Sequence, residues 1–157
     1  MRKYGWIALV VLVLDQLSKL AVQCLTQPLV LVPGVLELRY AENTGMAFGL
    51  FAGRPWLLGL VSAAVIVAGI AVLRRYRLGV VSGVAAMLML GGAVGNMLDR
   101  LFRGYVIDMF DVLFMKFAVF NVADAALTVG CGLMMISLVL IPKDWSKKHG
   151  DTEGNPV

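Results

Sequence analysis

Two aspartates, Asp108 and Asp124, are the residues of this chain whose type and setting most clearly indicate chemistry. Both belong to the stretch from Gly104 to Asp124, which stands between very apolar segments where a charge is costly unless it has a use. Asp108 follows one apolar segment, and Asp124 lies about one turn into the next, so both can reach the same end of a helical bundle. Two carboxylates held close together can share one proton and activate a water molecule.

A purely structural interpretation of the same two residues is also open. Asp108 would then be a solvated acid in a loop. Asp124 would be an acid in the first turn of a helix, where negative charge interacts favourably with the helix dipole. The choice between these two interpretations depends on the rest of the sequence.

The composition predicts an integral membrane protein. Of the 157 residues, 60% are hydrophobic and only 15% are charged, and the mean hydropathy is +0.85. These values differ strongly from those of soluble domains. Several apolar runs reach about 20 residues, which is enough to cross a hydrocarbon layer about 30 Å thick. We therefore predict an all-α membrane protein that forms a single domain over residues 1–157.

The sequence gives no sign of a metal, a cofactor or a nucleic-acid partner. The only histidine, His149, lies in a polar tail, and Cys24 and Cys131 lie in apolar segments as small hydrophobic residues, so a zinc site lacks ligands. A metal site made of carboxylates alone would leave no signature. The net charge of +4 comes from clusters flanking the apolar runs, unlike the basic and aromatic surface of a nucleic-acid-binding protein.

Four apolar segments are predicted to span the membrane, at about residues 6–25, 56–73, 80–101 and 121–141, before a polar, disordered tail at residues 144–157. The first is longer than the apolar region of a typical signal peptide and contains charges, so we interpret it as a helix. Between the first two segments, residues 29–32 and 35–40 fit short strands joined by a Pro33-Gly34 turn. A small β-structured segment is therefore expected on the membrane surface.

The first apolar segment contains an acid and a base four residues apart, Asp15 and Lys19. At this spacing the two side chains share one face of a helix and can neutralise each other. Alternatively, this polar face turns into the bundle and orders the groups around Asp108 and Asp124.

The third and fourth segments carry polar residues at the end near the two aspartates. Asn96, Asp99 and Arg100 share one face of the third helix, where the simpler interpretation is an Asp-Arg pair that ends the helix at the interface. Asn121 and Asp124 stand three apart on the fourth helix. Amide groups at such positions can hydrogen-bond carboxylates or a substrate backbone, and an arginine can hold a carboxylate in place.

The flanking charges predict the orientation of a four-helix chain. Eight cationic residues flank the side of the chain termini: Arg2, Lys3, Arg74, Arg75, Arg77, Lys143, Lys147 and Lys148. Four flank the other side: Arg39, Arg54, Arg103 and Lys116. The excess predicts that both termini are cytoplasmic, which puts Asp108 and Asp124 at the outer membrane surface.

Five short blocks of polar and small residues follow one another along the chain. They read Asp15-Gln16-x-Ser18-Lys19, Asn43-x-Gly45-x-Ala47-Phe48-Gly49, Gly92-Ala93-x-Gly95-Asn96-x-x-Asp99-Arg100, Val106-x-Asp108 and Phe120-Asn121-x-Ala123-Asp124. Together they resemble the bacterial lipoprotein signal peptidases, also called signal peptidase II. Each block alone is weak, but the combination is highly specific and extends from the first predicted helix to the fourth.

This resemblance implies a four-helix membrane aspartic protease with an extracytoplasmic β-structured segment, located in the bacterial cytoplasmic membrane. Such enzymes cut the signal peptide from prolipoproteins just before a cysteine that carries a diacylglyceryl group. The resemblance implies that Asp108 and Asp124 are the catalytic dyad. It also implies binding or supporting roles for Asp15, Lys19, Asn43, Gly45, Asn96, Arg100 and Asn121. The expected partners are lipid-modified prolipoproteins and membrane lipids, and we expect a monomer.

Two other classes of protein compete with this interpretation. A small transporter or proton relay would use the intramembrane residues Asp15, Lys19, Asp99 and Arg100, and a scaffold would only bind lipids or helices. Transport sites tend to lie near the bilayer midplane, whereas Asp124 lies near the surface, and the second apolar segment carries no charge.

One residue departs from the pattern of the family. Ala125 follows Asp124 where the family commonly has serine or threonine. The departure argues against an essential hydroxyl group at this position.

Overall fold

The structure, a computed structural model, describes residues 2–45 and 54–147. Within them, four helices are long and apolar enough to cross a membrane: α1 Gly5–Val22, α2 Pro55–Leu73, α3 Val80–Phe102 and α4 Val122–Leu140. A short 3-10 helix, η1 Arg2–Tyr4, precedes α1. Residues 46–49 of the block that begins at Asn43, and residues 148–157 of the predicted tail, lie outside the described residues.

The helix ends agree with the predicted spans to within one residue, with one exception. α1 ends at Val22 instead of residue 25. A turn follows immediately, because the N–H of Leu25 donates to the carbonyl of Val22 at 3.1 Å. The apolar character of the sequence continues past this turn, which is why composition alone placed the end of the helix too late.

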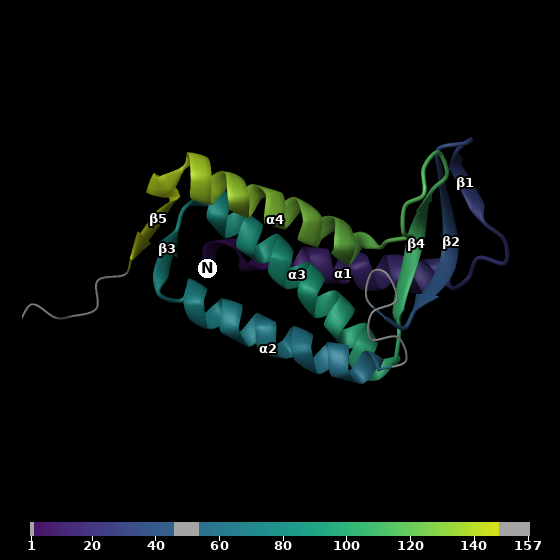
Figure 1. Ribbon diagram of the computed structural model, residues 1–157, viewed down its shortest axis with the longest axis horizontal. Helices are drawn as coiled ribbons and strands as arrows, with labels where there is room; N and C mark the ends of the chain where they lie inside the picture. The colour runs from purple at the N-terminus through teal and green to yellow at the C-terminus, as the bar shows by residue number, and fades with distance from the viewer. Residues whose placement is uncertain (1, 46–53, 148–157) are drawn as a thin grey trace, which may run out of the picture.

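α3 is the central helix, and α1, α2 and α4 all pack against it (Figure 1). Glycines permit the closest of these contacts. A Cβ atom on Gly91 would lie 2.7 Å from the carbonyl oxygen of Ala8, and one on Gly95 would lie 2.5 Å from Oδ2 of Asp15. The small residues of α3 therefore let α1 approach closely, which brings a carboxylate against the backbone of α3.

A three-stranded antiparallel sheet lies across one end of the bundle (Figure 1). Its strands are β1 Leu29–Val32, β2 Leu36–Asn43 and β4 Val106–Val112, in the order β1-β2-β4. The sequence analysis predicted two strands here and left Asp108 between the third and fourth helices without a strand of its own. That connection contains a third strand, because residues 106–112 pair with β2 and Asp108 stands opposite Ala41 in the register.

The opposite end of the bundle carries a two-stranded ribbon. β3 Tyr76–Leu78 pairs antiparallel with β5 Trp145–Lys147, which follows the 3-10 helix η3 Pro142–Asp144. The prediction that the tail is disordered from residue 144 was therefore wrong for residues 144–147. Two short segments that are unremarkable alone form a ladder because the ends of α2 and α4 bring them together (Figure 1).

Asp144 attaches this ribbon to the start of α3. Its carboxylate accepts from the backbone N–H of Ser82 at 2.5 Å and from the hydroxyl of Ser137 at 2.9 Å, and its carbonyl accepts from the N–H of Gly79 at 2.8 Å. Burial opposes the ionisation of Asp144, but the hydrogen bonds outweigh it and hold its pKa below the usual value. Asp144 therefore serves as a helix cap that comes from a distant part of the chain.

Candidate active site

Asp108 and Asp124 reach the sheet end of the bundle from two different elements. Asp108 lies in β4 and is only 3% exposed. Asp124 lies in the first turn of α4, at the third helical position after the N-cap residue Asn121. The structure thus brings together the two carboxylates that the sequence analysis singled out.

Asn121 connects the two aspartates. Its Oδ1 accepts from the N–H of Asp124 at 2.9 Å, and its own N–H donates to Oδ2 of Asp124 at 3.2 Å. This reciprocal capping box follows from the Asn-x-x-Asp spacing at the helix start. The side-chain Nδ2 of Asn121 donates to Oδ1 of Asp108 at 2.7 Å. Asn121 therefore orients both carboxylates, that of Asp108 with its side chain and that of Asp124 with its backbone N–H.

The surroundings of Asp108 favour its protonated form. Burial raises its pKa most, and the negative charge of Asp124 raises it further. Hydrogen bonds from Asn43 to Oδ2, at 3.0 Å, and from Asn121 to Oδ1 lower the pKa, as does the charge of Lys19. The net effect raises the pKa of Asp108 to about 6. Asp108 can therefore exchange a proton close to neutral pH.

Asn96 on α3 orients Asp124. Its Nδ2 donates to Oδ1 of Asp124 at 2.7 Å. Its Oδ1 accepts from Nζ of Lys19 at 3.0 Å and from Nδ2 of Asn121 at 3.1 Å. Because two donors meet the amide oxygen, the amino group of Asn96 is left to face the carboxylate.

Neutral amides supply the hydrogen bonds that Asp108 and Asp124 accept. In the described ranges 2–45 and 54–147, every ion pair involves an acid other than these two. A hydrogen bond from an amide fixes the position of a carboxylate and favours its ionised form less strongly than a cation at ion-pair distance does. The pair is therefore held in place while it stays able to gain and lose a proton.

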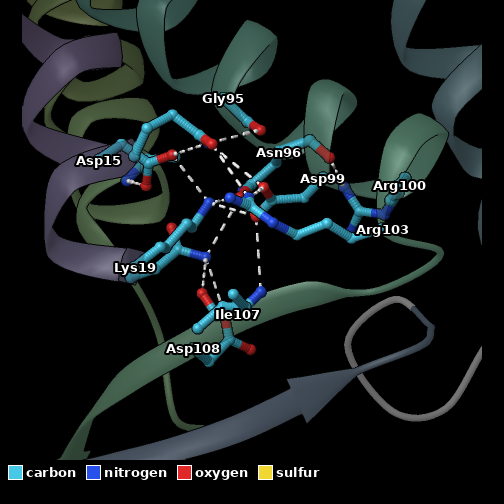
Figure 2. Close-up of polar contacts among 12 residues, drawn as sticks. Asp15, Lys19, Gly95, Asn96, Asp99, Arg100, Arg103, Ile107 and Asp108 are labelled. Atoms are coloured by element: carbon cyan, nitrogen blue, oxygen red, sulfur yellow. Dashed lines mark hydrogen bonds and ion pairs between the residues drawn. The ribbon is translucent and has the colours of Figure 1, made fainter. Parts of the chain in front are cut away.

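A buried ion network lies close to Asp108 (Figure 2). Nζ of Lys19 lies 2.8 Å from Oδ2 of Asp15 and 2.7 Å from Oδ2 of Asp99, and all three side chains are fully buried. Arg103 makes a further ion pair with Asp99. Two cations and two carboxylates thus neutralise one another between α1 and α3.

Asp15 also holds the start of α4. Its Oδ1 accepts from the N–H of Ala123 at 3.0 Å, one residue before Asp124. The two interpretations of Asp15 and Lys19 are therefore compatible, because the residues pair with each other and their shared face turns into the bundle. Through Lys19, the network also reaches Asn96 and hence the candidate pair.

Asp99 and Arg100 do not form the helix-ending pair that was the simpler sequence interpretation. Asp99 pairs with Lys19 and Arg103, which reach it from α1 and from one turn further along. Arg100 donates to the carbonyls of Asn96 and Gly45 at 3.4 Å each, and no described carboxylate lies within ion-pair distance of it. Arg100 therefore borders the site next to Gly45.

Sequence reasoning missed two members of the network. Nε2 of Gln16 donates to Oδ1 of Asp99 at 3.2 Å, and Arg103 donates to Oε1 of Gln16 at 3.0 Å. Arg103 stands four residues after Asp99, so the helical spacing was a usable signal for that pair. Gln16 stands in the first of the five blocks, but no helical spacing indicated that it would meet Asp99 and Arg103, which lie at the end of α3.

No group of three or more histidine, cysteine or acidic residues is placed to hold a metal ion within the part of the chain that the structure describes. The oxygens of Asp108 and Asp124 are instead engaged by Asn43, Asn96 and Asn121. The arrangement suits proton transfer between two carboxylates and a small molecule between them.

The chain belongs to the signal peptidase (SPase) II family, whose sequence profile matches residues 7–140. The resemblance inferred from the five blocks is therefore confirmed, and the chain is a peptidase of this family. The lipoprotein signal peptidase of Bacillus subtilis (strain 168) is 38% identical over 143 residues, which cover 87% of this chain and 93% of that protein. The lipoprotein signal peptidase of Lactobacillus johnsonii is 39% identical over 144 residues, covering 88% and 92%.

Two solved structures share the fold. A bacterial membrane enzyme determined at 2.3 Å resolution has a TM-score of 0.82 and 25% sequence identity, and the match covers 96% of this chain and 95% of that one. A second bacterial membrane enzyme, at 1.9 Å resolution, has a TM-score of 0.76 at 25% identity over 90% of this chain and 95% of that one. The four helices and the small sheet are thus the architecture of a known class of membrane enzymes.

Proposed function

We propose that this protein is a membrane aspartic endopeptidase that removes the signal peptide from diacylglyceryl-modified prolipoproteins, cutting just before the lipidated cysteine. The observation that carries the proposal is the pair Asp108 and Asp124, joined through Asn121 and hydrogen-bonded by amides alone. Membership in the signal peptidase II family supports the reaction, and the names of the relatives support the substrate class.

In the proposed reaction the two carboxylates share one proton. The ionised aspartate takes a proton from a water molecule, whose oxygen attacks the scissile carbonyl carbon. The protonated aspartate donates to the carbonyl oxygen, and a proton then passes to the departing nitrogen as the C–N bond breaks. The pKa of about 6 suits Asp108 to hold the shared proton in the resting enzyme.

We assign supporting roles to the residues that surround the pair. Asn43, Asn96 and Asn121 orient the carboxylates, and Asp15 and Lys19 hold α1, α3 and α4 in register. Nε of Arg100 has no hydrogen-bond partner among the described residues. Its guanidinium group is therefore suited to bind a substrate carbonyl next to Gly45.

The position of the pair suits a substrate that is itself membrane-bound. A signal helix lies in the bilayer and the lipidated cysteine carries acyl chains, so the bond to be cut lies at the hydrocarbon boundary. The start of α4 and the adjoining sheet lie at one end of four apolar helices (Figure 1). An enzyme dissolved in water would not meet this bond there.

We further propose that the protein is a monomeric, single-domain enzyme of the bacterial cytoplasmic membrane with both termini in the cytoplasm. The eight cationic residues on the terminal side against four on the other support this orientation. Labels attached at Arg75 should then react only with reagents on the cytoplasmic side, and labels at Lys116 only from outside. A label at Lys116 that reacts from the cytoplasm would invert the orientation.

The test of the activity is cleavage of a lipidated peptide containing a lipobox cysteine by the purified protein. Mass spectrometry of the products should show a single cut before the lipidated cysteine and no cut in the same peptide without the lipid. Absence of cleavage by a correctly folded protein, or indifference to the lipid, would contradict the proposal.

The transporter interpretation has no observation in its favour. Its working residues would be Asp15, Lys19, Asp99 and Arg100. The first three pair with one another and with Arg103, and Arg100 borders the candidate site next to Gly45. A charge that moves with an ion or a proton needs a free partner or a water-filled path. The ion pairs instead link the helices to one another, which is a structural role.

A further inference from the structure

An apolar groove of about 430 Å³ runs between α2 and α4, with α3 as its floor. Aliphatic and methionine side chains line it, and Trp145 of β5 closes one end; its lining includes Val65, Gly69, Val72, Leu90, Leu138 and Trp145. The volume falls within the range of small-molecule sites, about 300–1,000 Å³. In Figure 1, α2 and α4 lie on either side of α3, and the β3–β5 ribbon lies at the end of the bundle away from the three-stranded sheet.

Cationic residues follow directly on both helices that form the walls of the groove. Arg74 and Arg75 follow α2, Arg77 lies in β3, and Lys143 follows α4. All four side chains are exposed, and none of them forms an ion pair within residues 2–45 and 54–147. We call these four residues the cationic rim.

The neighbouring acid does not neutralise the cationic rim. The carboxylate of Asp144 accepts hydrogen bonds from Ser82 and Ser137, and so is directed into the bundle at the start of α3. Among residues 2–45 and 54–147, this end of the molecule therefore presents positive charge without a matching negative charge.

The ribbon separates an apolar face from a charged face. Tyr76, Leu78 and Trp145 are half-buried, whereas Arg77 between them is exposed. The rings of Tyr76 and Trp145 meet edge to face with centroids 5.6 Å apart. Tyrosine and tryptophan concentrate where membranes meet water, so the ribbon lies at the depth of the lipid headgroups.

We propose that the groove and the cationic rim form a binding site for an anionic phospholipid of the membrane that the helices cross. One acyl chain lies in the apolar groove, and the phosphate lies among Arg74, Arg75 and Lys143. The complementarity carries the inference, because the site joins an apolar channel to an uncompensated positive rim. Basic clusters at the ends of membrane helices attract anionic headgroups. The site is separate from the aspartate pair and does not depend on its activity.

A signal-peptide helix fits this end of the groove less well. Signal peptides begin with a positively charged region before their apolar segment. If such a helix filled the groove with its start at the ribbon, its cations would face Arg74, Arg75 and Lys143. Like charges repel one another, whereas the negative charge of a phosphate would be attracted to these cations.

Gly69 allows the groove to be filled without disturbing the helix. A Cβ atom on Gly69 would meet no atom within 4 Å, and this residue lines the groove. Gly69→Leu therefore places an apolar side chain where the acyl chain would lie, and leucine favours a helix more than glycine does. Gly132→Leu is the matched control, because Gly132 is an exposed glycine of α4 that also has open space around it and does not line the groove.

Lipid binding is measured by native mass spectrometry. The purified full-length protein is titrated with phosphatidylglycerol or with phosphatidylcholine. We expect the parent protein to bind phosphatidylglycerol at least about tenfold more tightly than phosphatidylcholine. Gly69→Leu should lose about tenfold or more of that affinity, and Gly132→Leu should stay within about twofold. The variant Arg74→Gln, Arg75→Gln, Lys143→Gln should lose about fivefold for each charge removed and bind both lipids alike. Thermal unfolding of each variant checks that it is folded.

Three results would overturn the proposal. The parent protein could bind both lipids equally, or Gly69→Leu could bind phosphatidylglycerol as Gly132→Leu does. The third is that Gly69→Leu raises the KM for a lipidated signal peptide while lipid binding is unchanged, which would assign the groove to the substrate helix.

Discussion

Four aspartates lie close together at the sheet end of the bundle, and they form two pairs with opposite surroundings. Asp15 and Asp99 are fully buried, and both form ion pairs with Lys19. Asp108 and Asp124 accept their hydrogen bonds from neutral amides. The residue type is the same in both pairs, and only the donors differ.

This difference separates structure from chemistry. A cation at ion-pair distance forms a strong, charge-assisted hydrogen bond with a carboxylate, which suits a permanent link between helices. An amide donor favours the ionised form less strongly than a cation does, so burial still raises the pKa of Asp108 to about 6. We infer that the paired acids hold the fold and the amide-bonded acids carry out the reaction, and the following variants test that division.

The largest effect is expected from Asp108→Asn and Asp124→Asn. Each removes a proton-transfer group while keeping the shape of the side chain, so cleavage should fall by about 10²–10⁴-fold at near-normal abundance. Steady-state cleavage of a lipidated peptide measures the loss. Asp111→Asn on the same strand is the control, because Asp111 only pairs with the half-exposed Arg39 and should keep activity near that of the parent. Retention of more than a few per cent of activity by either dyad variant would argue against a dyad.

Removing the cation that Asp15 and Asp99 share should lower the stability of the protein. Lys19→Met leaves two fully buried carboxylates without their shared cation, so the free energy of unfolding should fall by about 3–5 kcal/mol. Denaturant unfolding in detergent measures it. Adding Asp15→Asn to Lys19→Met removes one of the stranded charges and should recover part of the loss. If Lys19→Met unfolds like the parent protein, the network does not hold the helices together.

Asn43→Ala should alter the pH dependence of the reaction. The hydrogen bond from Asn43 stabilises the ionised form of Asp108, so its loss raises the pKa of Asp108 above about 6. The shared proton is then retained to higher pH, and the alkaline limb of the kcat/KM profile should move upward by about one unit. The profile is measured with one peptide across the pH range for both proteins. If the alkaline limb stays in place or moves to lower pH, Asp108 does not hold the shared proton.

The smallest effect is expected from Ala125→Ser, which adds the hydroxyl that the resemblance to the family led us to expect next to Asp124. One additional hydrogen bond near the helix start contributes about 0.5–1.5 kcal/mol, so cleavage should remain within several-fold of the parent protein. The same peptide assay measures both proteins. A rise of about 10²-fold, equivalent to about 2.7 kcal/mol, would mean that the hydroxyl belongs to the catalytic groups.

The sequence was informative where the signal is local. The four spans follow from runs of apolar residues, and the Asn121–Asp124 capping box follows from residues three apart. The pairing of Asp15 with Lys19 follows from residues four apart on one helix. Each of these features is set by neighbours along one element.

Features that depend on a distant partner could not be predicted in this way. β4 is a strand because β2 lies beside it, and β5 is a strand because α2 and α4 bring it to β3. Asp99 had three possible cationic partners in Lys19, Arg100 and Arg103, and only the packing of α1 on α3 decides among them. Periodicity identifies a polar face but not the element that it will meet.

The i to i+4 spacing of Asp15 and Lys19 has a consequence for the synthesis of the protein. α1 enters the membrane carrying its own counterion, so it can insert before any other helix exists. Asp99 likewise has an i+4 partner in Arg103, but its ion pair with Lys19 forms only when α3 packs against α1. The last helix then brings Asp124 against groups that are already ordered. A chain made from the N-terminus therefore brings Asp108 and Asp124 together only after α4 has been synthesised.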